Sequence, residues 1–473
     1  MPPVIKDAVD LAFAVAVVIA AATASGHAVI YKRDSRSAAI WVLVIWVLPA
    51  LGAIAYALLG VNRVQRRAAR LRRGMVRHRA DARLPAGEPG THLTPLARLV
   101  SEVVERPLVS GNAIEPLVDG VHAFPAMLQA INAARTSIAM SSYIFDDDGI
   151  GADFVRALSQ AAARGVAVRV LIDDVDARFS TSSAVKPLRK GGVQVAVFNP
   201  PLVPARLHAL NLRNHRKILV VDGTLGFTGG MNVDCRYWRP EAPERAYRDL
   251  HFRLHGPVVA QLMEVFVDDW QFATDEALRG SKWFPPLAAQ GGCLARAIEA
   301  GPDEAFERVR WAILGGVNAA QRSVRVLTPY FIPDQALITA LDAAALRGVE
   351  VDIVIPDETD LPHVRWAMFG QLWQVLDHGC RVWTRLGPFD HSKLLVVDGA
   401  WTLLGSANWD ARSLRLNFEM NIECYSVELG AHMDGLIQAR IGTARELSLE
   451  AVSARSLPVK LRDGVARLFA PYL

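Results

Sequence analysis

The chain has 473 residues, of which 51% are hydrophobic, and a formal net charge of +4. That length is too great for one compact core and predicts two or three domains. Its four cysteines, Cys235, Cys293, Cys380 and Cys424, form no CxxC or Cys/His cluster, which argues against a disulfide framework or a structural zinc site. The basic excess is local, so net charge alone does not indicate a nucleic-acid binder.

Two apolar stretches open the chain, from about Leu11 to Tyr31 and from about Ala38 to Leu59. Each approaches the roughly 20 residues that a helix needs to cross a bilayer. We therefore expect a two-helix transmembrane hairpin over residues 1–62, with a bend at Pro49. Two alternatives stay open at this point: a cleaved signal peptide, which the acidic Asp7 disfavours, and a pair of buried helices in a soluble protein.

A cationic stretch follows the second apolar segment and contains Arg63, Arg66, Arg67, Arg70, Arg72, Arg73, Arg77, Arg79 and Arg83. By the positive-inside rule this flank is cytoplasmic, and next to anionic lipid it would hold the following domain at the membrane surface. Residues 63–116 are interpreted as this arginine-rich segment plus a connector, because Pro85, Gly87, Pro89 and Gly90 interrupt any helix.

The remainder of the chain contains two copies of one unit, at about 117–290 and 291–473. In each copy a strand-like run (137–145 and 323–333) precedes an alanine-rich helical stretch that ends at Arg-Gly-Val and enters a second β-branched run. Glycine just past a helix, followed by a Val/Ile-rich strand, is typical of α/β units. The pattern predicts two α/β/α units related by a pseudo-twofold axis, with a mostly parallel sheet covered on both faces.

Both copies carry the same polar residues at the same spacing. The first has His215, Lys217, Asp222, Gly229-Gly230, Asn232, Asp234, Arg236 and Asp249, and the second has His391, Lys393, Asp398, Gly405-Ser406, Asn408, Asp410, Arg412 and Glu419. A histidine and a lysine two apart on a strand share a face, and Asp-Gly favours a hairpin that brings the asparagine segment back beside them. A lone His-x-Lys is usually an ordinary surface feature, but the same set in two equivalent places is not expected by chance.

Two facing copies would offer two imidazoles, two ammonium groups and two carboxamides to one anion. That set suits transfer of a phosphodiester: one histidine attacks phosphorus, while the other protonates the leaving alkoxide. Lys217, Lys393, Asn232 and Asn408 would bind the phosphate oxygens. This chemistry needs no metal or other cofactor.

The pattern His-x-Lys-x4-Asp-x6-Gly-[Gly/Ser]-x-Asn, present twice, resembles that of the phospholipase D superfamily. The paired apolar stretches, the segment from Thr328 to Pro333 and the segment from Arg412 to Glu419 are similar to bacterial cardiolipin synthases in particular. The resemblance implies catalytic residues His215, Lys217, Asp222, His391, Lys393 and Asp398, with His215 as nucleophile and His391 as general acid and then base. It also implies that Asp249 and Glu419 each orient the imidazole of their own half, and that Asp222 and Asp398 are more structural than catalytic. Gly230, where the second copy has Ser406, removes one hydroxyl from the pair.

Two weaker features complete the chain. Asp146-Asp147-Asp148 favours a solvated loop over a metal site, and residues 457–473 show helical spacing that fits either a membrane-surface helix or packing on the domain.

The function expected from the resemblance is transfer of a phosphatidyl group between two phosphatidylglycerol molecules at the bacterial cytoplasmic membrane, with the catalytic domain on the cytoplasmic side. The alternatives are a phospholipase D that uses water or another acceptor, a nucleic-acid phosphodiesterase and a non-catalytic scaffold. Anionic phospholipids are the expected partners. No nucleic acid is expected, because no basic groove studded with aromatic residues is evident.

Overall fold

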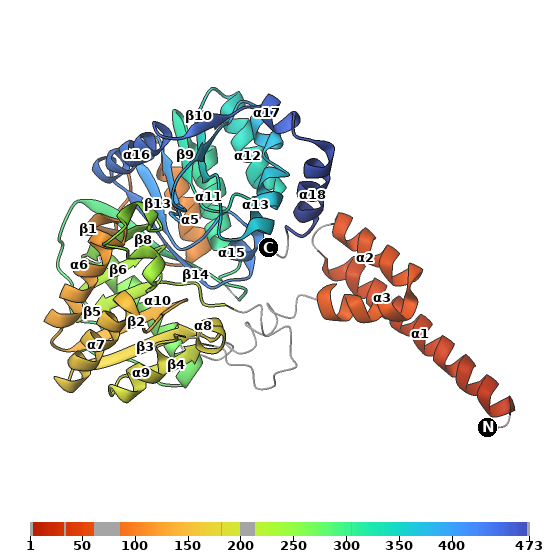
Figure 1. Cartoon of the computed structure of the whole chain (residues 1–473), viewed down its shortest axis with the longest axis horizontal. Helices are drawn as coiled ribbons and strands as arrows, with labels where there is room; N and C mark the ends of the chain where they lie inside the picture. Colours follow the sequence, from red (N-terminus) through yellow and green to blue (C-terminus); the bar gives the residue numbers. More distant parts are fainter. Residues whose placement is uncertain are drawn as a thin grey trace.

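The computed structural model describes residues 3–32, 35–60, 86–180, 182–198, 213–303 and 305–470. Figure 1 shows two sheet-and-helix halves side by side and a group of N-terminal helices apart from them. The arginines at 63–83 lie outside the described residues, so their predicted position at the membrane is not part of the fold described below.

The N-terminal group contains α1 (Pro3–Tyr31), α2 (Ser35–Val47), α3 (Pro49–Ala55) and a short π-helix (Tyr56–Gly60). Among the described residues, only the segment Lys6–Tyr31 of α1 is long and apolar enough to cross a membrane. Its 26 residues would measure about 39 Å at 1.5 Å per residue. A single helix of this kind is also found in signal sequences and in protein cores.

The second apolar stretch bends at Pro49, as predicted, and is divided into α2 and α3; the two-helix transmembrane hairpin itself stays a prediction. The backbone leaves helical geometry at Leu48, with φ −131° and ψ 70°, and Pro49 begins a new helix. Proline has no N–H to continue the preceding helix, but it fits the first position of the next one. As a result α2 and α3 pack against each other and against α1, around Ala21, Ala28, Ile45 and Tyr56.

The first sheet half begins with three parallel strands and ends with antiparallel ones. The parallel strands are β2 (Ser137–Ser142), β3 (Ala167–Asp173) and β4 (Gln194–Phe198). They are connected through α7 (Gly149–Ala163), α8 (Asp174–Phe179) and α9 (Val185–Lys190). The antiparallel strands are β5 (Ile218–Val221), β6 (Leu225–Gly229), β7 (Leu250–His255) and β1 (Val109–Val118).

The second half repeats this arrangement. Its parallel strands are β9 (Ser323–Leu327), β10 (Glu350–Pro356) and β11 (Arg381–Arg385). Their connections contain α12 (Gln335–Leu346), α13 (Pro362–Phe369) and α14 (Trp373–Leu376). The antiparallel strands are β12 (Leu394–Val397), β13 (Trp401–Gly405), β14 (Glu419–Tyr425) and β8 (Cys293–Ala300), and β15 (Arg445–Leu447) adds an edge beside β11.

The two halves join edge to edge, because β1 pairs antiparallel with β8. The result is one 15-stranded sheet of order β15-β11-β10-β9-β12-β13-β14-β8-β1-β7-β6-β5-β2-β3-β4. Read outward from the β8–β1 seam, the two sides repeat the same strand order, which confirms the predicted pseudo-twofold relation. The prediction of a mostly parallel sheet is wrong. Among the strands of the described residues, only β2–β3–β4 and β9–β10–β11 pair in parallel, because the chain then returns through hairpins at the Asp-Gly turns.

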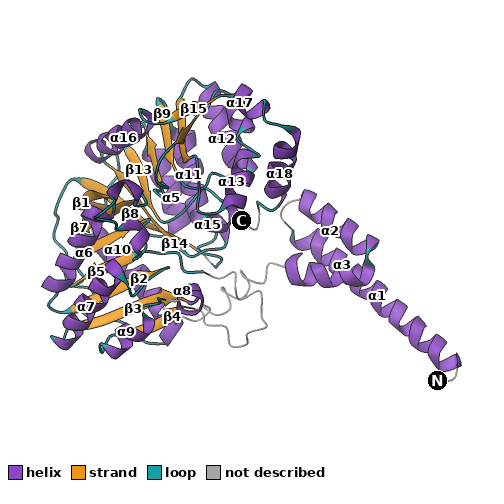
Figure 2. Cartoon of the chain, viewed as in Figure 1, coloured by secondary structure: helices purple, strands orange, loops and turns teal. Residues whose placement is uncertain are grey.

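Helices cover both faces of the sheet (Figure 2). Alternating side chains show this in β12, where Leu394 and Val396 face a core shared by both halves and Leu395 and Val397 face the opposite core. The shared face carries α10 (Val258–Thr274) and α16 (Val427–Ile441). The opposite face carries α6 (Gly120–Ala133) and α7 over the first half, and α5 (Thr94–Val104), α11 (Arg308–Ala319) and α12 over the second.

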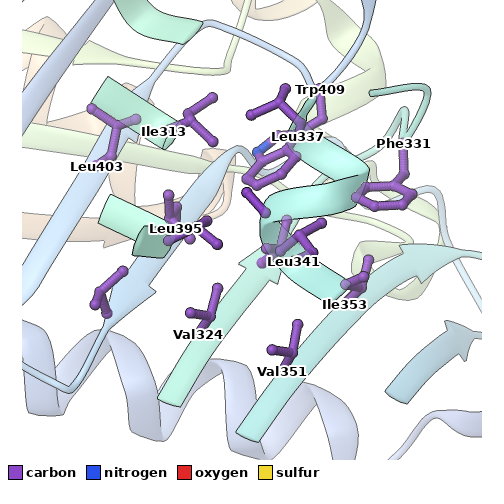
Figure 3. Close-up of a cluster of buried hydrophobic side chains, with 14 of the residues drawn as sticks. Ile313, Val324, Phe331, Leu337, Leu341, Val351, Ile353, Leu395, Leu403 and Trp409 are labelled. Atoms are coloured by element: carbon purple, nitrogen blue, oxygen red, sulfur yellow. The ribbon is translucent and has the colours of Figure 1, made fainter. Parts of the chain in front are cut away.

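Figure 3 shows part of this second-half core, where Ile313, Leu337 and Leu341 from the helices pack on strand residues such as Val324 and Val351. Most of residues 94–116, expected to be connector, instead form α5 and β1 (Val109–Val118). Leu96, Val100 and Val104 of α5 are buried in this core beside α11. Proline and glycine do interrupt the chain before residue 91, but the apolar spacing of 96, 100 and 104 is that of an amphipathic helix.

Candidate active site

The two predicted histidines lie in one pocket of about 210 Å³. Its lining comes from both halves and includes His215, Asn232, His391 and Asn408. Both histidines are held in short extended segments just before β5 and β12, rather than inside those strands. The duplication therefore converges on a single site, as the sequence predicted.

Each histidine segment is hydrogen-bonded to the other half of the molecule. The His215 amide donates to the Phe418 carbonyl at 2.9 Å, directly before Glu419. In the equivalent place the His391 amide donates to the Arg248 carbonyl at 2.7 Å, directly before Asp249. These two bridges fix the position of each acid relative to the opposite imidazole.

The expectation that each acid orients the imidazole of its own half is therefore wrong. The Nδ1 of His215 lies 3.0 Å from Glu419 Oε2, and the Nδ1 of His391 lies 2.8 Å from Asp249 Oδ2. The pairs are crossed, because the backbone bridges that position the acids run between the halves. The spacing within one repeat is compatible with either pairing, so the sequence held no signal to choose between them.

The two acids differ in their surroundings. Glu419 also accepts hydrogen bonds from Ser406 Oγ at 2.5 Å and Asn417 Nδ2 at 3.2 Å. Burial alone would raise the pKa of Glu419, but His215, Lys217 and Ser406 together hold it below its ordinary value. Its carboxylate is therefore ionised at neutral pH.

Asp249 lacks the equivalent hydroxyl because position 230 is glycine. A Cβ atom at Gly230 would lie 2.3 Å from Asp249 Oδ1, so the carboxyl group occupies the space that a serine side chain would need. Burial raises the pKa of Asp249 to about 8, even though Lys393 and the Leu250 amide lower it. Burial therefore makes Asp249 less acidic than Glu419, which in addition receives the Ser406 hydrogen bond that the repeat lacks at position 230.

The His391 imidazole is buried and that of His215 is 12% exposed, and loss of hydration lowers the pKa of each. For His215 the neighbouring Glu419 opposes this effect, whereas for His391 the pKa falls well below its ordinary value because Lys393 and Lys217 add to it. In the described part of the chain, no protein atom hydrogen-bonds the Nε2 of either ring. Each ring is thus held by Nδ1 and has Nε2 available to a ligand.

The two motif lysines lie behind the histidines rather than in the pocket wall. Lys217 and Lys393 are 2% and 4% exposed, and each ammonium group donates to the carbonyl of the histidine two residues before it. Burial lowers the pKa of Lys217 to about 7 and that of Lys393 to about 8. A bound anion would favour the charged form of both.

The two asparagines line the pocket as predicted. Asn232 Oδ1 accepts from the Ile144 amide at 3.3 Å, and Asn408 Oδ1 is buried with no hydrogen-bond partner among the described residues. Carboxamide N–H groups so placed can donate to phosphate oxygens.

The motif aspartates lie at the Asp-Gly turns, and neither lines the pocket. Asp222 accepts from the amides of residues 135, 136 and 137, and Asp398 accepts from those of residues 321, 322 and 323 and from His92 Nε2 at 2.7 Å. These backbone hydrogen bonds lower the pKa of both carboxyl groups against the effect of burial. Their structural role, suggested by the resemblance, fits this arrangement; a catalytic role has no geometric basis.

Sequence reasoning missed the aromatic wall. Tyr143 lies 5.0 Å from His215 between ring centroids, Tyr330 lies 6.3 Å from His391, and the Tyr237 hydroxyl is 3.0 Å from His391 Nδ1. Tyr143 and Tyr330 follow the first parallel strand of each half, β2 and β9, but they are offset by one position when the repeats are aligned. Tyr237 comes from a single-turn 3-10 helix (Cys235–Tyr237), and no sequence signal pointed to it.

The structure brings Asp146 close to two other possible metal ligands. Ligand atoms of Asp146, Asp234 and Cys235 lie within 4.8 Å of one another outside the pocket. Asp234 is already bound by Arg236 at 2.5 Å, and Asp146 is within 3.5 Å of two serine hydroxyls, which accounts for the cluster without an ion.

A family described as "Cardiolipin synthase, PLD-like domain" matches residues 127–270 and 313–440, and one described as "Phospholipase_D-nuclease N-terminal" matches residues 12–60. The chain belongs to the cardiolipin synthase family of phospholipase D-like proteins. The family match takes in both histidine motifs, and the N-terminal match takes in all of α2 and α3. Among relatives named cardiolipin synthase, that of Staphylococcus aureus is 31% identical, covering 93% of this chain and 92% of the relative. That of Listeria monocytogenes is 32% identical, covering 77% and 76%.

A solved structure supports the fold of this cardiolipin synthase family member. The crystal structure of phosphatidylserine synthase from Haemophilus influenzae aligns over 80% of this chain and 100% of its own, with a TM-score of 0.63 and 15% sequence identity. At that identity the likeness concerns the fold alone.

Proposed function

We propose that this enzyme transfers a phosphatidyl group from one phosphatidylglycerol to the terminal hydroxyl of another and releases glycerol. One observation carries the proposal: His215 and His391, from two copies of one motif, line a single pocket with Nε2 free. Such a pair can divide the work of nucleophile and proton donor in displacement at a phosphodiester. The relatives named cardiolipin synthase supply the substrate class.

The number of protons held by each acid–histidine pair supports His215 as the nucleophile. Its partner Glu419 is ionised, so Nδ1 carries the ring proton and donates it, and the Nε2 lone pair faces the pocket. The Asp249–His391 pair differs, because the raised pKa of Asp249 keeps one more proton on that pair at neutral pH. The pair that holds the additional proton is the one suited to act as general acid.

In the first step, His215 Nε2 attacks phosphorus, the P–O bond to glycerol breaks, and His391 delivers a proton from Nε2 to the departing oxygen. In the second step, His391 takes the proton from the terminal hydroxyl of the acceptor lipid. That oxygen then attacks phosphorus, and the P–N bond to His215 breaks. The ammonium groups of Lys217 and Lys393 and the amides of Asn232 and Asn408 stabilise the phosphate charge. No metal takes part in these steps.

The proposed setting is the bacterial cytoplasmic membrane, with the catalytic halves on the cytoplasmic side. The apolar helix α1 and the family match over residues 12–60 support membrane association. The arginines at 63–83 favour the cytoplasmic side by the positive-inside rule. A second crossing would need α2 and α3 to straighten at Pro49 or to span together as a broken helix.

The test uses the full-length protein reconstituted with phosphatidylglycerol vesicles. We expect equal amounts of cardiolipin and free glycerol, and a phosphatidyl adduct on His215 when the wild-type reaction is quenched early. Phosphatidic acid as the main product would identify a hydrolase instead. Well-folded protein that releases no glycerol in several lipid mixtures would refute the proposal.

A further inference from the structure

The C-terminal helix α18 (Leu457–Leu468) has an uncovered apolar face. The residues of this apolar stripe are three or four positions apart in the helix, and their side chains are between 55% and 72% exposed. They are Leu457, Leu461, Val465 and Leu468, with Phe469 directly after the helix. Residues so spaced lie on one side of a helix. Five large apolar side chains in one stripe form a patch of the kind that marks an interaction surface.

The opposite side of α18 is fixed to the protein. Asp463 is buried there and binds Arg455 at 2.6 Å and Arg462 at 2.7 Å. The Arg462 guanidinium also lies 4.7 Å from the centre of the Trp366 ring in α13, and Arg455 donates to the Phe369 carbonyl at 3.0 Å. The helix is therefore held at a defined orientation with its stripe facing outward.

The charge around the stripe is positive. Lys460 is exposed, Arg467 is half-buried, and the only acid in Leu457–Leu468 is the buried and paired Asp463. An apolar stripe with cations at its sides matches a bilayer surface that carries anionic headgroups. A second copy of the chain fits less well, because docking about a twofold axis would bring the two sets of cations together.

The stripe is also connected to the active site. Helix α13, on which α18 packs, begins at Pro362, and Leu361 and Val364 at its N-terminal end line the pocket. The eight residues of α13 span about 12 Å at 1.5 Å per residue. A bilayer in contact with α18 is thus one short helix from the pocket.

We propose that α18 lies on the surface of the anionic bilayer and holds the pocket at the level of the lipid headgroups. This inference rests on the proposed membrane setting, but it does not require the proposed reaction. Its apolar residues enter the headgroup boundary, while Lys460 and Arg467 contact lipid phosphates.

The first experiment measures depth rather than activity. Full-length protein carrying Cys235→Ser is spin-labelled at Val465→Cys or, as a control, at Val427→Cys, and reconstituted in vesicles of phosphatidylglycerol and phosphatidylethanolamine. Val427 is another exposed valine, at the start of α16, a helix that Figure 1 shows at the upper left, away from α18 on the right. We expect the label at 465 to be relaxed more by oxygen than by a nickel chelate, and the label at 427 to show the reverse. Equal nickel access at both positions, or spin–spin broadening between labels at 465, would overturn the inference.

The second experiment measures turnover. The double change Leu461→Asp and Leu468→Asp should lower turnover of vesicle phosphatidylglycerol about tenfold and leave turnover of short-chain, monomeric phosphatidylglycerol unchanged. Val427→Asp should alter neither rate. Unchanged turnover on vesicles would refute the inference, and so would an equal loss on both substrates in a protein of unchanged melting temperature. If no variant turned over any lipid, the proposed reaction would fail, and the spin-label depths would still decide the position of α18.

Discussion

The crossed pairing of acids and histidines gives the sharpest test of the site. Replacing Glu419 with Gln should damage the function of His215, and replacing Asp249 with Asn should damage that of His391, because the Nδ1 contacts of 3.0 and 2.8 Å run between the halves. Hydrogen bonds to a charged group contribute about 1.5–3 kcal/mol. Glu419→Gln loses the ionised partner of His215, so the step that depends on this imidazole should slow by about 10- to 150-fold.

The assay compares two substrates with different leaving groups in order to distinguish the nucleophile from the general acid. Glycerol needs a proton to depart, whereas p-nitrophenol does not, so a phosphatidyl p-nitrophenyl ester bypasses the general acid. We expect His391→Ala and Asp249→Asn to retain a burst of p-nitrophenol and to lose turnover of phosphatidylglycerol. In contrast, His215→Ala should lose the burst entirely, and Glu419→Gln should slow it.

The comparison does not depend on which histidine attacks first. If the roles were exchanged, both members of each crossed pair would exchange their behaviour together. The pairing would be refuted if Glu419→Gln behaved like His391→Ala, or if Asp249→Asn behaved like His215→Ala. Circular dichroism and melting temperature of each variant provide the control for folding.

Three other predictions follow from the site. Gly230→Ser should reduce turnover at least tenfold in the vesicle assay. The serine Cβ would lie 2.3 Å from Asp249 Oδ1 and would displace that carboxyl group. Wild-type activity of this variant would contradict the prediction, because it would show that the carboxyl group can move freely. Asp398→Asn should lower the free energy of unfolding by about 1–3 kcal/mol, because it weakens the hydrogen bonds from three backbone amides. The folded fraction should keep its activity. An unchanged melting temperature in thermal unfolding would contradict this prediction. The apparent kcat/KM should fall as pH rises above about 8. The pKa values of Lys217 and Lys393 are about 7 and about 8 in the free protein, and deprotonation of these lysines removes the positive charge that attracts the phosphate. A kcat/KM that stays level to pH 10 would refute this role.

The repeat made most of the site predictable. His215, His391, Asn232 and Asn408 meet in one pocket because the same local sequence folds in the same way twice. The Asp-Gly hairpins were predictable too, because aspartate at 222 and 398 adopts the positive φ that such turns require, 51° and 54°.

Long-range contacts decided what the sequence could not show. The crossed pairs depend on backbone hydrogen bonds between Phe418 and His215 and between Arg248 and His391, each joining residues far apart in the chain. The bend at Pro49 was predictable from the proline, whereas the packing of α2 and α3 against α1 around Tyr56 was not. Local sequence patterns predict the helices and strands, but contacts between these helices and strands determine how they are arranged.

The halves that join at the β1–β8 pairing depend on each other for the position of their histidines. Each half contributes an imidazole that only the opposite half can align, and Arg216 of the first motif strengthens this link by donating to the Glu419 and Ala300 carbonyls, both at 3.0 Å. Any separation of the halves would remove both of the Nδ1 contacts that hold His215 and His391. We therefore expect that separating the halves would disable both histidines together, and that one half expressed alone would have no activity.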